Sequence, residues 1–205
     1  MRYRFTALVV TVAMAVLAQS CRSSADSQAP LDWSHMRAMH GQGIQSYSVE
    51  EFKNETGHEV ILPSYLPTGG IYQYMLSDTS QSGRFVADLS IIPSPQTDSP
   101  VISLQEKERS PGEPIPRYGG EYETTVVGKT TIACETLGPD SGFPGNFNSP
   151  VPGSPSPKQS LLCLWDDQSL SYEAQFGSRS ETVDQQLKDE AMKVITSMIE
   201  RPYAP

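Results

Sequence analysis

Alternating apolar and polar residues predict β-strands through the middle of the chain and toward its end. The clearest alternation lies at residues 170–176, where the apolar members are Leu170, Tyr172, Ala174 and Phe176. A period of two with polar residues between is typical of a strand that has one side in solvent. Similar runs occupy 85–92 and 101–108. A shorter run at 122–126 leads into Gly128-Lys129, which is typical of a tight turn.

Two helices flank this strand-rich region. Ser48 and Glu51 have the spacing of a capping box, so a short helix should run to about Thr56 and stop at Gly57. A longer helix is expected from about Thr182 to Glu200, with Thr182 and Gln185 as its capping box. Its apolar face recurs at steps of three and four, through Leu187, Ala191, Val194, Ile195 and Met198.

The order of these elements predicts an α+β fold. We expect an antiparallel sheet of about 6–8 strands, with the C-terminal helix packed on one face and the short helix before the first strand. A strand over 59–62 should end at Pro63, because proline lacks an amide donor, and a new strand should begin at Ile71. The domain is predicted to span 48–201, with a Pro/Gly-rich loop over 138–158.

The N-terminus reads as an export signal. Two arginines precede a nearly unbroken apolar run, Phe5 to Ala18, which is shorter than the roughly 20 residues that a spanning helix needs. Residues 1–20 are therefore expected to be a signal peptide. The small polar residues that follow predict a flexible tether over 21–47.

Leu17-Ala18-Gln19-Ser20-Cys21 resembles the lipobox of bacterial lipoproteins. The resemblance implies that Cys21 is diacylated and becomes the new N-terminus, so that the chain is exported and held on a membrane by its lipid. The pattern departs at Ala18, where leucine is usual. Cleavage by ordinary signal peptidase, which would give a secreted protein, is the alternative.

Three cysteines leave one unpaired if a disulfide forms. If Cys21 carries lipid, the remaining pair is Cys134 and Cys163, which flank the 138–158 loop and share strand parity with apolar neighbours. We predict a disulfide between them. Two buried free thiols are the alternative.

Several short motifs are similar to those of an uncharacterised C-terminal domain found in bacterial lipoproteins and in membrane-tethered proteins like anti-sigma factors. They are Ser48 to Glu51, Leu62 to Gly69, Val127-Gly128-Lys129, Leu164-Trp165, Tyr172 and Ser197-Met198-Ile199. The resemblance covers about residues 48–200 and implies a fold and a place in the cell envelope. A regulatory role is implied only by the kinds of protein in which this domain is found. Departures are Gly70-Ile71, where an aromatic residue is usual, the cysteine pair and the long loop.

Charge excludes one class of partner. The formal net charge is -9, and removal of residues 1–20 with their two arginines makes it -11. Such an acidic chain, without a basic patch, is not expected to bind nucleic acid. Attachment to an anionic membrane would have to come from the acyl chains.

Candidate chemistry is sparse, and we expect neither a cofactor nor a metal nor a recognisable catalytic residue. The segment 35–40 holds two histidines and two methionines, which suit copper, but no cysteine or repeat accompanies them, so a linker turn is favoured. Adjacent Asp166 and Asp167 could bind a cation, although solvated carboxylates are the simpler interpretation.

Two functions stay open. The first is an envelope-anchored, non-catalytic binding module for an unknown protein, glycan or lipid. The second is an exported hydrolase whose site is assembled from scattered residues such as His58 and Asp166. A deep pocket with an acid or base of shifted pKa would favour the enzyme, whereas a filled core with an exposed apolar patch would favour binding.

Overall fold

The computed structural model describes ten segments of the chain, which all fall within one unit, 31–205. They are 31–33, 36–39, 45–67, 71–80, 84–94, 99–109, 121–138, 159–167, 170–177 and 182–200. The predictions for the signal peptide 1–20, for Cys21, for the two histidines of the 35–40 segment and for most of the 138–158 loop lie outside these residues.

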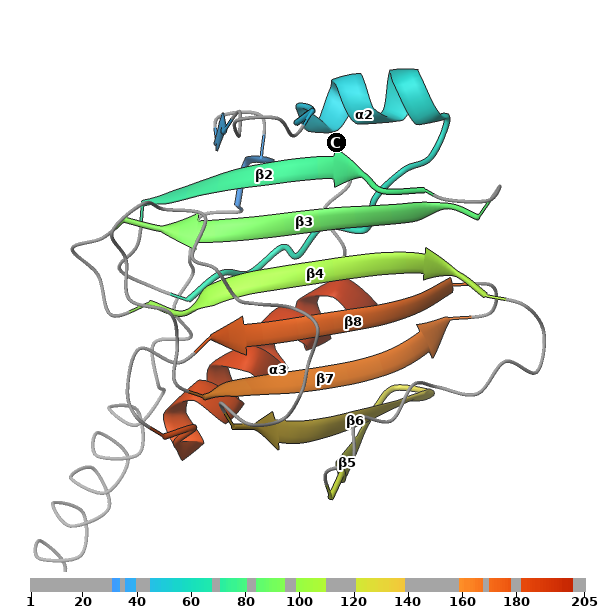
Figure 1. Ribbon diagram of the computed structural model, residues 1–205. Helices are drawn as coiled ribbons and strands as arrows, with labels where there is room; N and C mark the ends of the chain where they lie inside the picture. The colour runs from blue at the N-terminus through green and yellow to red at the C-terminus, as the bar shows by residue number, and fades with distance from the viewer. Residues whose placement is uncertain are drawn as a thin grey trace, which may run out of the picture. The chain divides into compact units, whose positions relative to one another are not determined.

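Eight strands form one sheet, in the order β1-β2-β3-β4-β8-β7-β6-β5 (Figure 1). They are β1 (Arg37–Ala38), β2 (Tyr72–Asp78), β3 (Val86–Pro93), β4 (Val101–Glu108), β5 (Glu123–Val127), β6 (Thr130–Leu137), β7 (Ser160–Asp167) and β8 (Leu170–Gly177). The helices are α2 (Val49–Thr56) and α3 (Gln185–Glu200). Strands β2 to β8 are antiparallel to their neighbours, so the predicted α+β class is confirmed. The two-residue β1 adds a parallel pairing to β2.

The C-terminal helix α3 covers one face of the sheet, behind β7 and β8 in Figure 1. Its predicted apolar stripe is confirmed, because all five residues are buried in the main core: Leu187, Ala191, Val194, Ile195 and Met198. The predicted start was wrong. The helix begins at Gln185, and Asp184 caps it by accepting a 2.8 Å hydrogen bond from the Leu187 amide. We call the sheet side that bears α3 the core face.

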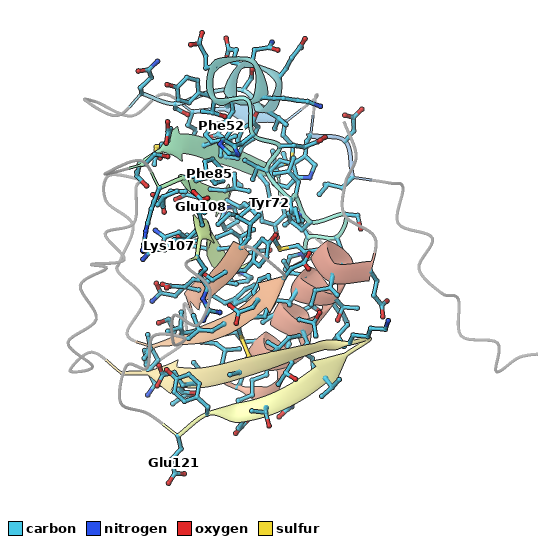
Figure 2. All side chains as sticks on the ribbon, turned by 90° about the vertical axis from the view of Figure 1, so that its right-hand side faces the viewer. Phe52, Tyr72, Phe85, Lys107, Glu108 and Glu121 are labelled. Carbon is cyan, nitrogen blue, oxygen red and sulfur yellow. A yellow bond between two sulfur atoms is a disulfide. The ribbon has the colours of Figure 1, made fainter. Side chains whose placement is uncertain are left out.

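The short helix α2 has the predicted ends. Ser48 and Glu51 form a capping box, in which each side chain accepts from the other's amide, and Gly57 ends the helix with a φ of 73°. Phe52 is its buried anchor and packs edge-on against Phe85, with ring centroids 6.2 Å apart (Figure 2). Phe52 also packs edge-on against Tyr47, with centroids 5.7 Å apart, and these two aromatic contacts help to hold so short a helix on the sheet.

The segment 59–67 does not form the strand predicted over 59–62. It is extended but belongs to no strand of the sheet, and it passes behind β3 and β4 in Figure 1. Val60, Leu62 and Leu66 are buried in the core, while Pro63 and Pro67 have no amide hydrogen to give a strand ladder. Side chains replace that ladder. The Ile61 amide donates to Glu106, and the Tyr65 amide donates to the Ser197 hydroxyl.

The folded unit begins earlier than the predicted tether allowed. Trp33 is only 1% exposed, and its Nε1 donates a 2.9 Å hydrogen bond to the Pro63 carbonyl. Beyond it, β1 pairs with β2, and Tyr47 bridges to Leu76. The tether expected to reach residue 47 therefore ends before Trp33. The polar sequence around Trp33 hid this anchor, because no periodic pattern surrounds it.

The strand β8 is more buried than predicted on the sheet face opposite α3. Gln175 is only 7% exposed and donates a 2.8 Å hydrogen bond to the Ser160 hydroxyl. On the same side, Leu162 and Leu164 of β7 form a second small core with Leu137 and Tyr122. β7 is thus buried on both faces, which is why its sequence is an apolar run and does not alternate.

Cys134 of β6 and Cys163 of β7 lie directly opposite each other, with their Cα atoms 4.1 Å apart. Their sulfur atoms are at disulfide distance, and Figure 2 shows the bond between the two strands. The predicted pairing and the predicted neighbourhood of these strands are confirmed. The bridge encloses a sequence separation of 29 residues.

Removal of this bridge is expected to destabilise the domain by about 3–4 kcal/mol, because the unfolded chain then regains the entropy of a loop of this length. The comparison is between wild type and a Cys134→Ala, Cys163→Ala double variant in urea denaturation. Peptide mapping without reduction should recover the two cysteines in one linked fragment. Alkylation of both thiols in unfolded, unreduced wild type would contradict the pairing.

Candidate ligand pocket

The pairing of β4 with β8 places an acid beside a phenol. Glu106 of β4 lies opposite Tyr172 of β8, and Tyr172 in turn lies opposite Trp165 of β7. Directly opposed residues of antiparallel strands point to the same side of a sheet. All three therefore lie on the core face, near the edge where β4 and β7 end and β8 begins, at the right of Figure 1.

Glu106 is a buried carboxyl group, only 2% exposed. One oxygen, Oε1, accepts the hydrogen bond from the Ile61 amide, whereas Oε2 has no hydrogen-bond partner among the described residues. Burial raises the pKa of Glu106 to about 8, although the bond from Ile61 lowers it. At neutral pH the group is therefore mostly a neutral carboxylic acid.

Tyr172 is 3% exposed, and its ring stacks on Trp165 with centroids 5.2 Å apart and planes 9° from parallel. Its hydroxyl has no hydrogen-bond partner in the part of the chain that the structure describes. Burial raises the pKa of Tyr172, and the nearby charges of Glu106 and Asp167 raise it further, so the phenol keeps its proton. A buried hydroxyl without a partner costs about 1–3 kcal/mol.

Tyr172 lines a pocket of about 410 Å³, within the range of small-molecule sites. We call it the hairpin–helix pocket. Its walls come from the β5–β6 turn, from the ends of β7 and β8, from the last turn of α3 and from Ile61. The lining residues are Ile61, Gly128, Lys129, Thr130, Trp165, Asp167, Tyr172, Met198, Ile199 and Glu200.

The pocket has an apolar interior and charged residues at its rim. Trp165, Tyr172 and Met198 are buried, whereas Lys129, Asp167 and Glu200 are exposed. Within the described segments, none of these three charged side chains forms an ion pair. Their charges are therefore available to a bound molecule.

A second hollow, of about 480 Å³, lies between α3 and the segment at Ser64 and Tyr65. Its polar groups are largely used within the protein: Tyr65 donates its hydroxyl proton to Glu190, and Lys193 donates to the same carboxylate. Lys193 also lies 5.9 Å from the centre of the Tyr65 ring. We interpret this hollow as the seam by which the 59–67 segment docks on α3.

The residues singled out from the sequence do not form a common site. His58 stacks on Phe85, with centroids 4.0 Å apart, whereas Asp166 forms an ion pair with Arg109. No interaction in the structure joins His58 to Asp166. Over the described segments, no group of three or more His, Cys, Asp or Glu residues is arranged to hold a metal. Likewise, no described helix is long and apolar enough to cross a membrane.

Glu106 and Tyr172 were not recognised as site residues, although a signal was present. The run at 101–108 was expected to be a strand, and Glu106 continues the alternation of its apolar residues Ile102 and Leu104. A carboxyl group at an inward position of a strand is unusual and marks a place that needs explanation. Its neighbour Tyr172 could not be identified, because the sequence does not reveal that β4 pairs with β8.

Glu106→Gln is expected to change how stability depends on pH. Between pH 4.5 and about 8 the folded protein keeps a proton that the unfolded chain releases, so the contribution of Glu106 to stability is greatest below this window and falls as pH rises through it. One such group contributes up to about 1.4 kcal/mol per pH unit. Urea denaturation at several pH values should show a flatter curve for Glu106→Gln. The exposed Glu108→Gln is the control on the same strand, and parallel curves for wild type and Glu106→Gln would refute the assignment.

No protein-family model, curated protein or solved structure matches this chain. The similarity to a domain of bacterial lipoproteins therefore stays a prediction, and the hairpin–helix pocket is interpreted from its own geometry.

Proposed function

We propose that this chain is an exported, lipid-anchored protein whose folded domain binds a small molecule in the hairpin–helix pocket. The observation that carries the proposal concerns Tyr172, which lines a pocket of about 410 Å³ and whose buried hydroxyl has no hydrogen-bond partner among the described residues. A ligand that bonds to this hydroxyl would remove the cost of leaving it unpaired. A small molecule fits such a pocket better than the flat surface of another protein does.

The proposed anchor is the lipid on Cys21. It is supported by the basic start of the chain, by the apolar run that follows and by the lipobox-like residues before Cys21. The polar residues after Cys21 would then tether the domain to the membrane. In this arrangement the domain meets its ligand outside the cytoplasm.

Binding is favoured over hydrolysis because the carboxyl group with the most raised pKa among the described residues does not reach the pocket. A hydrolase would need a group such as Glu106, whose pKa is raised to about 8. Yet a general acid must come within hydrogen-bond distance of the proton that it transfers. Glu106 does not line the pocket, whereas Tyr172 does, and one Glu106 oxygen is held by the Ile61 amide.

Lipidation is tested by growth with radiolabelled palmitate. We expect label in the wild type and in a Ser20→Ala control, because alanine suits the position before the cysteine. Cys21→Ser should carry none, because it lacks the thiol that is acylated. Equal labelling of wild type and Cys21→Ser, or an unlabelled wild type, would contradict the proposed anchor.

Ligand binding is tested by filling the pocket. Thr130 lines it, whereas Thr124 is exposed on the neighbouring strand and lies opposite Ala133, on the other side of the sheet from α3. The full chain, held in phosphatidylcholine nanodiscs, is screened against a fragment library by ligand-observed NMR. Fragments should bind wild type and Thr124→Trp but not Thr130→Trp, because the indole occupies their space.

Two results would contradict this function. If no fragment binds wild type, or if Thr130→Trp binds as wild type does, the pocket is not the site. Conversion of bound fragments into hydrolysis products, lost in Glu106→Gln, would favour the hydrolase alternative. Recovery of unchanged fragments is the result that a binding module predicts.

A further inference from the structure

The rim of the hairpin–helix pocket carries an excess of negative charge. Two carboxylates, Asp167 and Glu200, and one ammonium group, Lys129, line it. Since none of the three has an ion-pair partner in the described part of the chain, their net charge of about one negative unit faces a molecule that enters. A cation would be attracted to this rim, and an anion would be repelled.

The interior offers an acceptor at a matching place. The Tyr172 hydroxyl can accept through its oxygen, and Tyr172 and Asp167 line the same pocket. A donor with several N–H groups could therefore bond to the phenol oxygen and to the Asp167 carboxylate together. Hydrogen bonds in which one partner is charged are the stronger kind.

The rest of the interior is apolar. Trp165 and Met198 are buried, and Ile61 and Ile199 complete the lining. A ligand needs an apolar group to fill this space, because burial of apolar surface against these side chains is favourable. A polar group there would lose its bound water without gaining hydrogen bonds. The volume of about 410 Å³ leaves room for a phenyl ring with a short chain.

We propose that the hairpin–helix pocket binds a small primary amine with an apolar group, its ammonium held between the Tyr172 hydroxyl and the Asp167 carboxylate. This inference rests on the proposed function, because it names the ligand class of the same pocket. Glu200 adds attraction at the rim, and Lys129, on an exposed turn, opposes it.

The test uses three probes of nearly the same shape, 2-phenylethylamine, 2-phenylethanol and 3-phenylpropanoate. Their binding to the full chain in phosphatidylcholine nanodiscs is measured by isothermal titration calorimetry. The amine should bind most tightly and the carboxylate most weakly. Asp167→Asn should weaken the amine by about threefold to tenfold, as expected for loss of a partly exposed charged partner. The same variant should leave the alcohol nearly unchanged.

Lys129→Ala provides a change of the opposite sign. Removal of the opposing charge should strengthen the amine about twofold to threefold. Glu50→Gln, on α2 and absent from the pocket lining, should leave the binding of all three probes unchanged.

Nanodiscs that contain phosphatidylethanolamine separate two sources of the amine. Loss of 2-phenylethylamine binding there assigns the amine to the lipid headgroup, and unchanged binding assigns it to a soluble molecule.

The inference and the proposed function fail separately. Equal binding of amine and alcohol, with Asp167→Asn indistinguishable from wild type, overturns the amine assignment and leaves a neutral-ligand pocket standing. Absence of binding by all three probes also overturns the amine assignment. The proposed function falls only if the fragment screen gives no ligand that Thr130→Trp excludes.

Discussion

The pairing of β4 with β8 is the constraint on which the rest of the structure depends. Each strand belongs to a separate run of antiparallel neighbours, and all residues of β4 pair with residues of β8, from Val101 opposite Gly177 to Glu108 opposite Leu170. A slip of one residue would turn every side chain of one strand to the other face. The observed register brings Glu106 and Tyr172 together on the core face, where α3 and the 59–67 segment cover them.

The same register explains why a carboxyl group is tolerated in the core. The 59–67 segment carries two prolines and lies outside the named strands, so some of its amides need acceptors from side chains. Glu106 supplies one for Ile61, and it does so at neutral pH mainly as an uncharged acid. Burial of a charge there would cost far more than burial of the acid. Support of this segment also shapes the pocket wall, since Ile61 lines the pocket.

Local features were predictable from the sequence, and distant pairings were not. The capping box of α2, the apolar stripe of α3 and the alternation of β3 and β4 depend on residues near one another in the chain, and all were found as expected. The disulfide could be predicted because the chain has only three cysteines. The order β4-β8, the early anchor Trp33 and the second core at Leu162 and Leu164 depend on tertiary contacts, which residue spacing does not encode. The pocket shares this origin, because its walls come from four parts of the chain.

The central claim is that the Tyr172 hydroxyl, which has no hydrogen-bond partner among the described residues, marks a site where a ligand binds. A crystal structure of the protein with 2-phenylethylamine tests it most directly, because it shows which atom meets the hydroxyl. Our account predicts the amine nitrogen within hydrogen-bond distance of Tyr172 Oη and of an Asp167 carboxylate oxygen, with the phenyl ring against Trp165 and Met198. Amine bound instead in the hollow beside Ser64 and Tyr65, or an empty pocket at saturating amine, would contradict it.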